Sequence, residues 1–265
     1  MTAGTDDIDT STPSRRAARN PAPGAGLVAY VAAAAFVVAA VWYGLAARFI
    51  TVARPPAFNP DAPLDAELHR WFNWFVTTIP QERIDAAIAI AGFLCLLPLA
   101  AFVRDLLGRD RTLVRIGSQA LPAGALLWVA GNVMQVGGHR AVGLMATHRD
   151  PIETVNAILF TVDTIDDAFE LAAFAVLGVA LLALAGAAVA GPIGDRAVPR
   201  AWCGHSLLLG AVLLALSVAH AVGGGDVVDL LLVVGGGLLL PAWLVWTGRL
   251  LRNATTSRAI PRFDP

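Results

Sequence analysis

Residues 171–190, LAAFAVLGVALLALAGAAVA, decide the fold class, because these twenty consecutive residues carry no charged side chain. An α-helix rises about 1.5 Å per residue, and the hydrocarbon core of a bilayer is about 30 Å thick. A run of this length and composition therefore predicts one transmembrane helix.

The whole chain has the composition of an integral membrane protein. Apolar residues make up 57% of its 265 residues and charged residues 15%, and the mean hydropathy is +0.65. These values exclude an ordinary soluble globular domain. The net charge of −1 offers no basic surface for a nucleic acid. The two cysteines, Cys95 and Cys203, lie in separate apolar segments, which argues against a disulfide framework. We therefore expect the lipid bilayer as the surroundings and no nucleic-acid partner.

Five further apolar segments join this run and predict six transmembrane helices in one domain, residues 26–250. The predicted spans are at about residues 26–47, 84–103, 116–137, 168–190, 201–222 and 227–246. Residues 1–25 are polar and predict a disordered tail, and residues 251–265 form a second tail. Residues 51–83 place apolar and charged side chains on opposite faces of a helix, which predicts an outer amphipathic helix on the membrane surface or a cap packed over the bundle. The predicted fold class is an all-α, polytopic membrane helix bundle.

The arginines predict the orientation of this bundle. Six spans put both ends of the chain on one side of the membrane. That side, with the loops at 104–115 and 191–200, holds 13 arginines and 7 acids, whereas the other side holds 6 arginines and 13 acids. Because short cytoplasmic segments are rich in basic residues, we expect both ends of the chain to lie in the cytoplasm.

Four acidic residues precede the apolar run, in the sequence VDTIDDAFE at 162–170. Asp163, Asp166, Asp167 and Glu170 are spaced i, i+3, i+4 and i+7, so a helix brings them to one face. The predicted orientation puts this acidic face at the outer boundary of the membrane, with Glu170 deepest. Ionisable side chains at membrane depth are costly and usually functional, so these acids are the main candidates for a cation or proton site.

Polar residues in the outer halves of other spans are expected at a similar depth. His139 and His220 are candidate members of the site. The supporting polar residues are Asn132, Gln135, Ser217, Asp226 and Asp229. Carboxylates with one or two imidazoles suit a divalent cation, and neighbouring carboxylates share protons. The alternative is structural: the acids lie in water at the helix end or pair with the outer arginines Arg83, Arg140 and Arg149.

Three classes of function are compatible with this pattern. The first is a small transporter or a cation- or proton-linked permease with an outward-facing acidic site. The second is a non-catalytic accessory or scaffold protein, in which the acids and residues 71–74, WFNW, contact a membrane-protein partner, a second copy of the chain or lipid headgroups. The third is an outer-face enzyme that binds haem or modifies lipids.

The sequence favours a non-enzymatic function and supplies no catalytic residue. It contains no HExxH motif, no P-loop and no serine elbow of a hydrolase. The acid spacing resembles the metal-binding acids of transferases that act on phosphorylated lipids, but no Gly-rich phosphate loop accompanies it. His205 and His220 are fifteen residues apart, about 22 Å along a helix, so they would serve different haems. A divalent cation is therefore a stronger candidate cofactor than haem.

The last two spans resemble a family of small bacterial six-helix membrane proteins whose function is uncharacterised. The resemblance rests on residues 198–202, VPRAW, which open the fifth span, and on residues 244–249, LVWTGR, which end the sixth. The family has a Pro-Arg-Trp-like entry, which Ala201 interrupts in this chain. The resemblance covers the C-terminal quarter and implies a six-helix bundle without catalytic residues. A bacterial cytoplasmic (inner) membrane is the localisation that we expect.

Overall fold

The computed structural model describes residues 24–49, 59, 62–109, 111–148, 151–190 and 198–256, and almost all of them are helical. The elements are α1 (Ala25–Phe49), α2 (Leu64–Leu107), α3 (Thr112–Thr147), α4 (Ile152–Val189), α5 (Arg200–Ala221), α6 (Gly225–Leu232), the π-helix η1 (Val233–Leu239) and α7 (Leu240–Thr256). No strand occurs in these ranges. The predicted N-terminal tail and most of the C-terminal tail lie outside the described residues.

Six helices are long and apolar enough to cross a membrane, as judged by length and composition. They are Ala25–Trp42, Arg83–Leu107, Thr112–Ala146, Ile152–Val189, Arg200–Ala221 and Gly225–Thr255. Each overlaps one of the six segments predicted from the sequence. The prediction of an all-α, multi-pass membrane protein is therefore confirmed as far as the number, length and composition of the helices are concerned.

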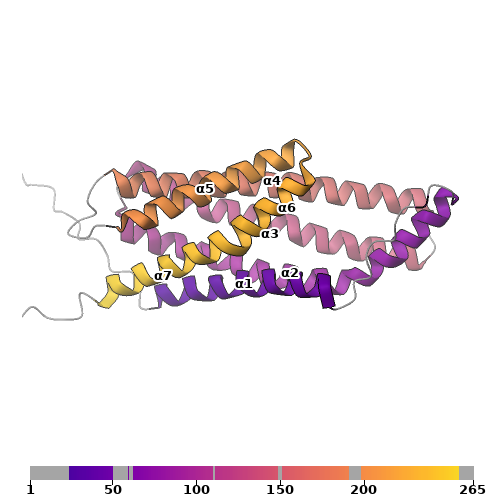
Figure 1. Ribbon diagram of the computed structural model, residues 1–265, viewed down its shortest axis with the longest axis horizontal. Coiled ribbons are helices and arrows are strands. Elements are labelled where there is room, and N and C mark those ends of the chain that lie inside the picture. Colours follow the sequence, from indigo (N-terminus) through magenta and orange to yellow (C-terminus); the bar gives the residue numbers. More distant parts are fainter. Residues whose placement is uncertain are drawn as a thin grey trace, which may run out of the picture.

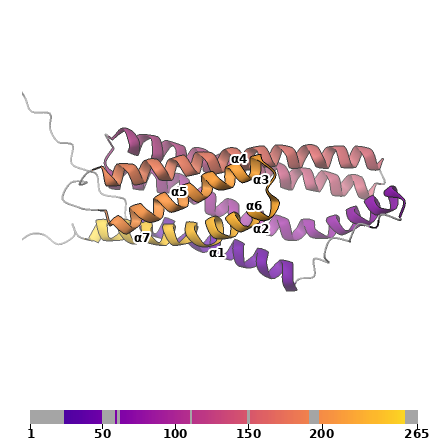
Figure 2. The same cartoon turned by 45° about the horizontal axis from the view of Figure 1, so that its top comes forward.

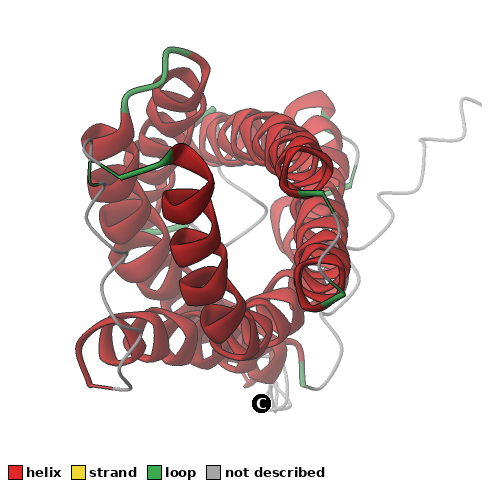
Figure 3. Cartoon of the chain, turned by 90° about the vertical axis from the view of Figure 1, so that its right-hand side faces the viewer, coloured by secondary structure: helices red, strands yellow, loops and turns green. Residues whose placement is uncertain are grey.

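The long hairpin of α3 and α4 runs the length of the molecule. These helices have 36 and 38 residues, and with α2 they continue past α1, α5 and α6 (Figure 1). Seen along the long axis, some helices run along the line of sight and others are inclined to it (Figure 3). We call the projecting part the extension: residues 64–82 of α2, 138–147 of α3 and 152–163 of α4. A 38-residue helix is about 57 Å long, so α4 projects beyond a bilayer without breaking.

The extension has a small apolar core of its own. Its buried members are Phe72, Phe75, Ile79, Val142, Val155 and Leu159. The helical part of the segment predicted to be amphipathic is the first half of α2, and it continues into the second span as one helix of 44 residues. One face of this half packs against α3 and α4. Residues 51–58, 60 and 61 of that segment lie outside the described residues.

Four glycines at intervals of seven let α3 lie close to α4. They are Gly117, Gly124, Gly131 and Gly138, and we call them the glycine seam. A Cβ atom added to any of them would come within 2.5–2.7 Å of an α4 side-chain atom. The neighbours are Leu184, Leu177, Asp166 and Val162 in turn. Small residues permit close helix approach in membranes, so this seam fixes how α3 and α4 are rotated relative to each other.

The last span is one helix interrupted by the π-helical turn η1. Gly235, Gly236 and Gly237 lie in this turn, and glycines permit the close approach of a neighbouring helix. A Cβ on Gly235 would lie 3.1 Å from Val212 Cγ1, while one on Gly236 would meet nothing within 4 Å. Close approach therefore occurs at the first glycine of the three.

Both ends of the described chain lie at the same end of the bundle. A Cβ on Gly26, at the start of α1, would meet the backbone oxygen of Gly248 in α7 at 2.9 Å. Figure 2 shows α7 ending there, opposite the extension. An even number of membrane crossings has this geometry.

Candidate functional site

The four acids of α4 differ in exposure. Asp166 is 5% exposed, Glu170 is partly buried, the Asp163 side chain is 49% exposed, and Asp167 is exposed. Residues 163, 166 and 170 lie on the side of α4 that carries its contacts with α3 and α5. The four acids therefore share one helix face but differ in their surroundings.

His139 of α3 pairs with Asp163 of α4. The Nε2–H of His139 donates to Asp163 Oδ1 at 3.0 Å, in the tautomer that carries this proton. The imidazole is buried, with the Phe75 ring of α2 at an edge-on centroid distance of 4.9 Å. Three helices therefore hold this pair at the base of the extension.

Glu170 and His220 form a second acid–imidazole pair, between α4 and α5. His220 Nε2 lies 3.7 Å from Glu170 Oε2, which is ion-pair distance but longer than a hydrogen bond. The Phe174 ring stacks beside the imidazole, with the two ring centroids 5.9 Å apart. Within the described chain, buried His220 Nε2 has no hydrogen-bond partner.

Asp166 lies between the two pairs along α4. Its Oδ1 occupies the notch that Gly131 leaves in α3, where a Cβ would be 2.7 Å away. This oxygen is buried and accepts no hydrogen bond from any described residue. An ionised carboxylate in such a place is costly unless a proton or a cation accompanies it. Of the four acids of α4, Asp166 is therefore the one with a buried oxygen that lacks a hydrogen-bond donor among the described residues.

The supporting polar residues have separate roles. Ser217 donates to the Leu171 carbonyl of α4 at 3.0 Å and so joins α5 to α4 beside Glu170. Asn132 is buried, and its amide donates to the Trp128 carbonyl one turn earlier, at 3.2 Å. Gln135 is half-buried in α3, and Asp226 and Asp229 are exposed in α6.

The predicted ligands do not gather around one point. Among the described residues, no three His, Cys, Asp or Glu side chains are placed to hold a metal ion. His205 has its own partner, because its Nε2–H donates to the Leu239 carbonyl at the end of η1, at 2.9 Å. Neither Arg83 nor Arg140 forms an ion pair with the four acids in the described structure, and Arg149 lies outside it. The geometry is that of separate acid–imidazole pairs.

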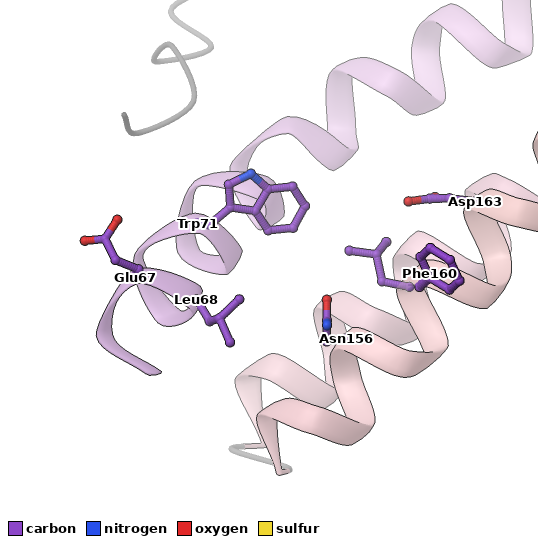
Figure 4. A pocket seen from close by; sticks show the side chains of 7 residues that line it. Glu67, Leu68, Trp71, Asn156, Phe160 and Asp163 are labelled. Atoms are coloured by element: carbon purple, nitrogen blue, oxygen red, sulfur yellow. The ribbon is translucent and has the colours of Figure 1, made fainter. Parts of the chain in front are cut away.

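A pocket of about 390 Å³ lies next to Asp163, between α2 and α4 in the extension (Figure 4). Its lining consists of Glu67, Leu68, Trp71, Asn156, Leu159, Phe160 and Asp163. The sequence pattern does not predict this pocket, because nothing in it shows that residues 67–71 face residues 156–163. The sequence analysis named two of its lining residues separately, Trp71 in the WFNW sequence and Asp163 in the acidic face.

No protein-family model, curated protein or solved structure matches this chain. The polar groups buried between α3, α4 and α5 are therefore the basis for inferring its function.

Proposed function

We propose that this protein is a small proton-linked transporter of the bacterial cytoplasmic membrane. Its proton-binding row comprises Asp163 with His139, then Asp166, then Glu170 with His220. The observation that carries this proposal is the buried oxygen of Asp166, which accepts no hydrogen bond from a described residue. Intramembrane carboxylates of this kind mark proton relays and ion pathways.

The spacing of the row supports proton transfer along α4. The three acids are three and four residues apart, and the whole row spans about 10 Å at the α-helical rise. Imidazole changes its charge near neutral pH, so each histidine offers an exchangeable proton beside a carboxylate. Two pairs with an isolated acid between them suit stepwise protonation better than they suit a chelated divalent cation, which needs several ligands around one centre.

The orientation of the row is part of the same proposal. The arginine-rich ends and loops are assigned to the cytoplasm, so Asp163 and the extension face outward. The pocket beside Asp163 is then the external entrance, and His220 lies on the inner side of the row.

Proton flux into vesicles tests the proposal directly. The purified protein is reconstituted with an internal pH-sensitive dye, and an imposed membrane potential drives protons inward. We expect Asp166→Asn and Glu170→Gln each to lower the proton flux at least tenfold, because a side-chain amide cannot bind and release a proton near neutral pH. The control is Glu153→Gln, which removes an exposed acid in the first turn of α4.

The scaffold alternative makes the opposite prediction. If both amide variants carry the same flux as the unaltered protein, the row has no role in proton movement. If the unaltered protein carries no flux above that of empty vesicles, the transport proposal fails as a whole.

A further inference from the structure

The pocket of the extension has a lining that selects for one kind of ligand. Its volume falls within the range of small-molecule sites, and most of its wall is apolar or aromatic. The polar members are Asn156 and two carboxylates, and no arginine of the described residues lines it. We propose that this pocket binds an alkylated ammonium group. This ligand is then the substrate class of the proposed transporter. Binding of the ligand does not depend on the proposed function, whereas its transport does.

The two carboxylates differ in how much charge they offer. Glu67 is buried and already accepts from Arg70 Nη2 at 2.7 Å and from the Asn59 backbone N–H at 3.1 Å. Figure 4 shows its carboxylate directed away from Asn156. Asp163 is half-exposed and accepts from His139 through Oδ1 at 3.0 Å, and the same view shows its carboxylate directed toward Trp71. Asp163 is therefore the anion that a bound cation meets.

Trp71 supplies an aromatic wall opposite this anion. Its ring stacks on Phe75 with an interplanar angle of 8° and a centroid distance of 5.3 Å, and Trp74 lies 6.0 Å away. These neighbours hold the indole in place. Phe160, on the α4 side, is 73% exposed. A cation over an indole face is stabilised by the charge distribution of the ring, and aromatic cages of this kind recognise quaternary ammonium groups.

The same lining argues against other ligands. A hydrated metal ion requires several oxygen ligands at short distance, and the pocket offers Asp163 and the amide of Asn156. An anion would meet a carboxylate and, in the part of the chain that the structure describes, no basic lining residue. An alkylated ammonium is weakly hydrated, so its methyl groups contact Leu68, Leu159 and the rings while its charge faces Asp163.

Calorimetric titration of the detergent-purified protein with choline tests the inference. We expect saturable binding, and at least tenfold weaker binding of the uncharged isostere 3,3-dimethylbutan-1-ol. Asp163→Asn and Trp71→Leu should each weaken choline binding at least fivefold. Trp71→Phe should restore most of it, and the control Glu153→Gln should match the unaltered protein.

Several results would overturn the inference. They are the absence of saturable choline binding, equal binding of choline and its isostere, and unchanged binding by Asp163→Asn. If circular dichroism shows that Trp71→Leu fails to fold, Asp163→Asn and the isostere decide the question.

Two further measurements separate this inference from the proposed function and identify the source of the ligand. Asp166→Asn, outside the pocket lining, should keep choline binding while it loses proton flux; flux retained with binding intact would refute the proton row alone. In nanodiscs, weaker choline binding with phosphatidylcholine than with phosphatidylglycerol identifies a lipid headgroup as the competing source. Equal binding in both identifies a free amine.

Discussion

The Asp166 carboxylate fits against α3 because residue 131 of that helix is a glycine, which has no Cβ atom. Its Oδ1 fills the space beside the Gly131 backbone, where a methyl group would be 2.7 Å from that oxygen and 2.8 Å from the Phe169 Cβ. A rigid backbone position therefore determines where the carboxylate lies. The acid and the glycine belong to one structural unit although 35 residues separate them in the sequence.

Gly131→Ala should destabilise the protein and lower its proton flux. The added methyl group overlaps Phe169 as well as Asp166, and overpacking of this kind costs about 1–3 kcal/mol. The expected result is a lower thermal midpoint in detergent, measured by circular dichroism. The control is Gly137→Ala on the same helix, where an added Cβ meets nothing within 4 Å. Equal midpoints for the two variants would show that α3 and α4 are not packed this closely.

A buried hydrogen-bonded group of tryptophans joins α5 to α7 far from the acids. Trp202 Nε1 donates to Thr247 Oγ1 at 3.0 Å, and Trp243 Nε1 donates to Ser206 Oγ at 2.8 Å. All four residues are buried. Each indole N–H therefore depends on one hydroxyl from the other helix.

Thr247→Val should cost about 1–3 kcal/mol of stability, because it leaves the Trp202 N–H buried without its acceptor. Adding Trp202→Phe removes that donor, so the double variant should be more stable than the sum of the two single changes predicts. Unfolding in detergent by a denaturant measures these differences. Thr255→Val on the same helix is the control, since the Thr255 hydroxyl donates locally to the Arg252 carbonyl. Strict additivity would mean that the pair has no energetic coupling.

For the helices, local composition predicted the six apolar spans, whereas the continuity of α2 depends on packing between helices. Residues 171–190 specify a span by themselves, whereas the union of residues 64–83 with the second span in α2 crosses Pro80 and a polar stretch. The sequence alone therefore placed a boundary where the structure has a continuous helix. Neighbours in a bundle can satisfy the backbone groups that a proline frees.

In the candidate site, too, the sequence predicted positions along one helix but not the contacts between helices. The spacing of the four acids predicted that they share one face of a helix. The partners of Asp163 and Glu170 depend in addition on how α3 and α5 are rotated relative to α4. The glycines at positions 117, 124, 131 and 138 carried part of this information, as a repeat of seven along one helix face. Such a repeat identifies the face that packs closely, and does not identify the helix that packs on it.

At the scale of the whole molecule, the orientation of the bundle determines which side the pocket serves. Fusions of a reporter to the C-terminus test the predicted orientation. We expect a fluorescent protein that folds only in the cytoplasm to be active there, and alkaline phosphatase to be inactive. The reverse pattern would place the extension in the cytoplasm and reassign the entrance of the proton row to the inner side.

The helix α4 contains no proline and is unbroken over 38 residues, while the last span is interrupted by η1 and contains Pro241. A stiff rod of about 57 Å acts as a lever, and a swing of about 5° displaces its far tip by about 5 Å. If α4 moves as one rigid body when the pocket is occupied, the displacement extends to Ala187, whose carbonyl accepts from Arg111 Nη1 at 2.8 Å. That hydrogen bond lies at the end of α4 opposite the pocket, so such a displacement would change its length.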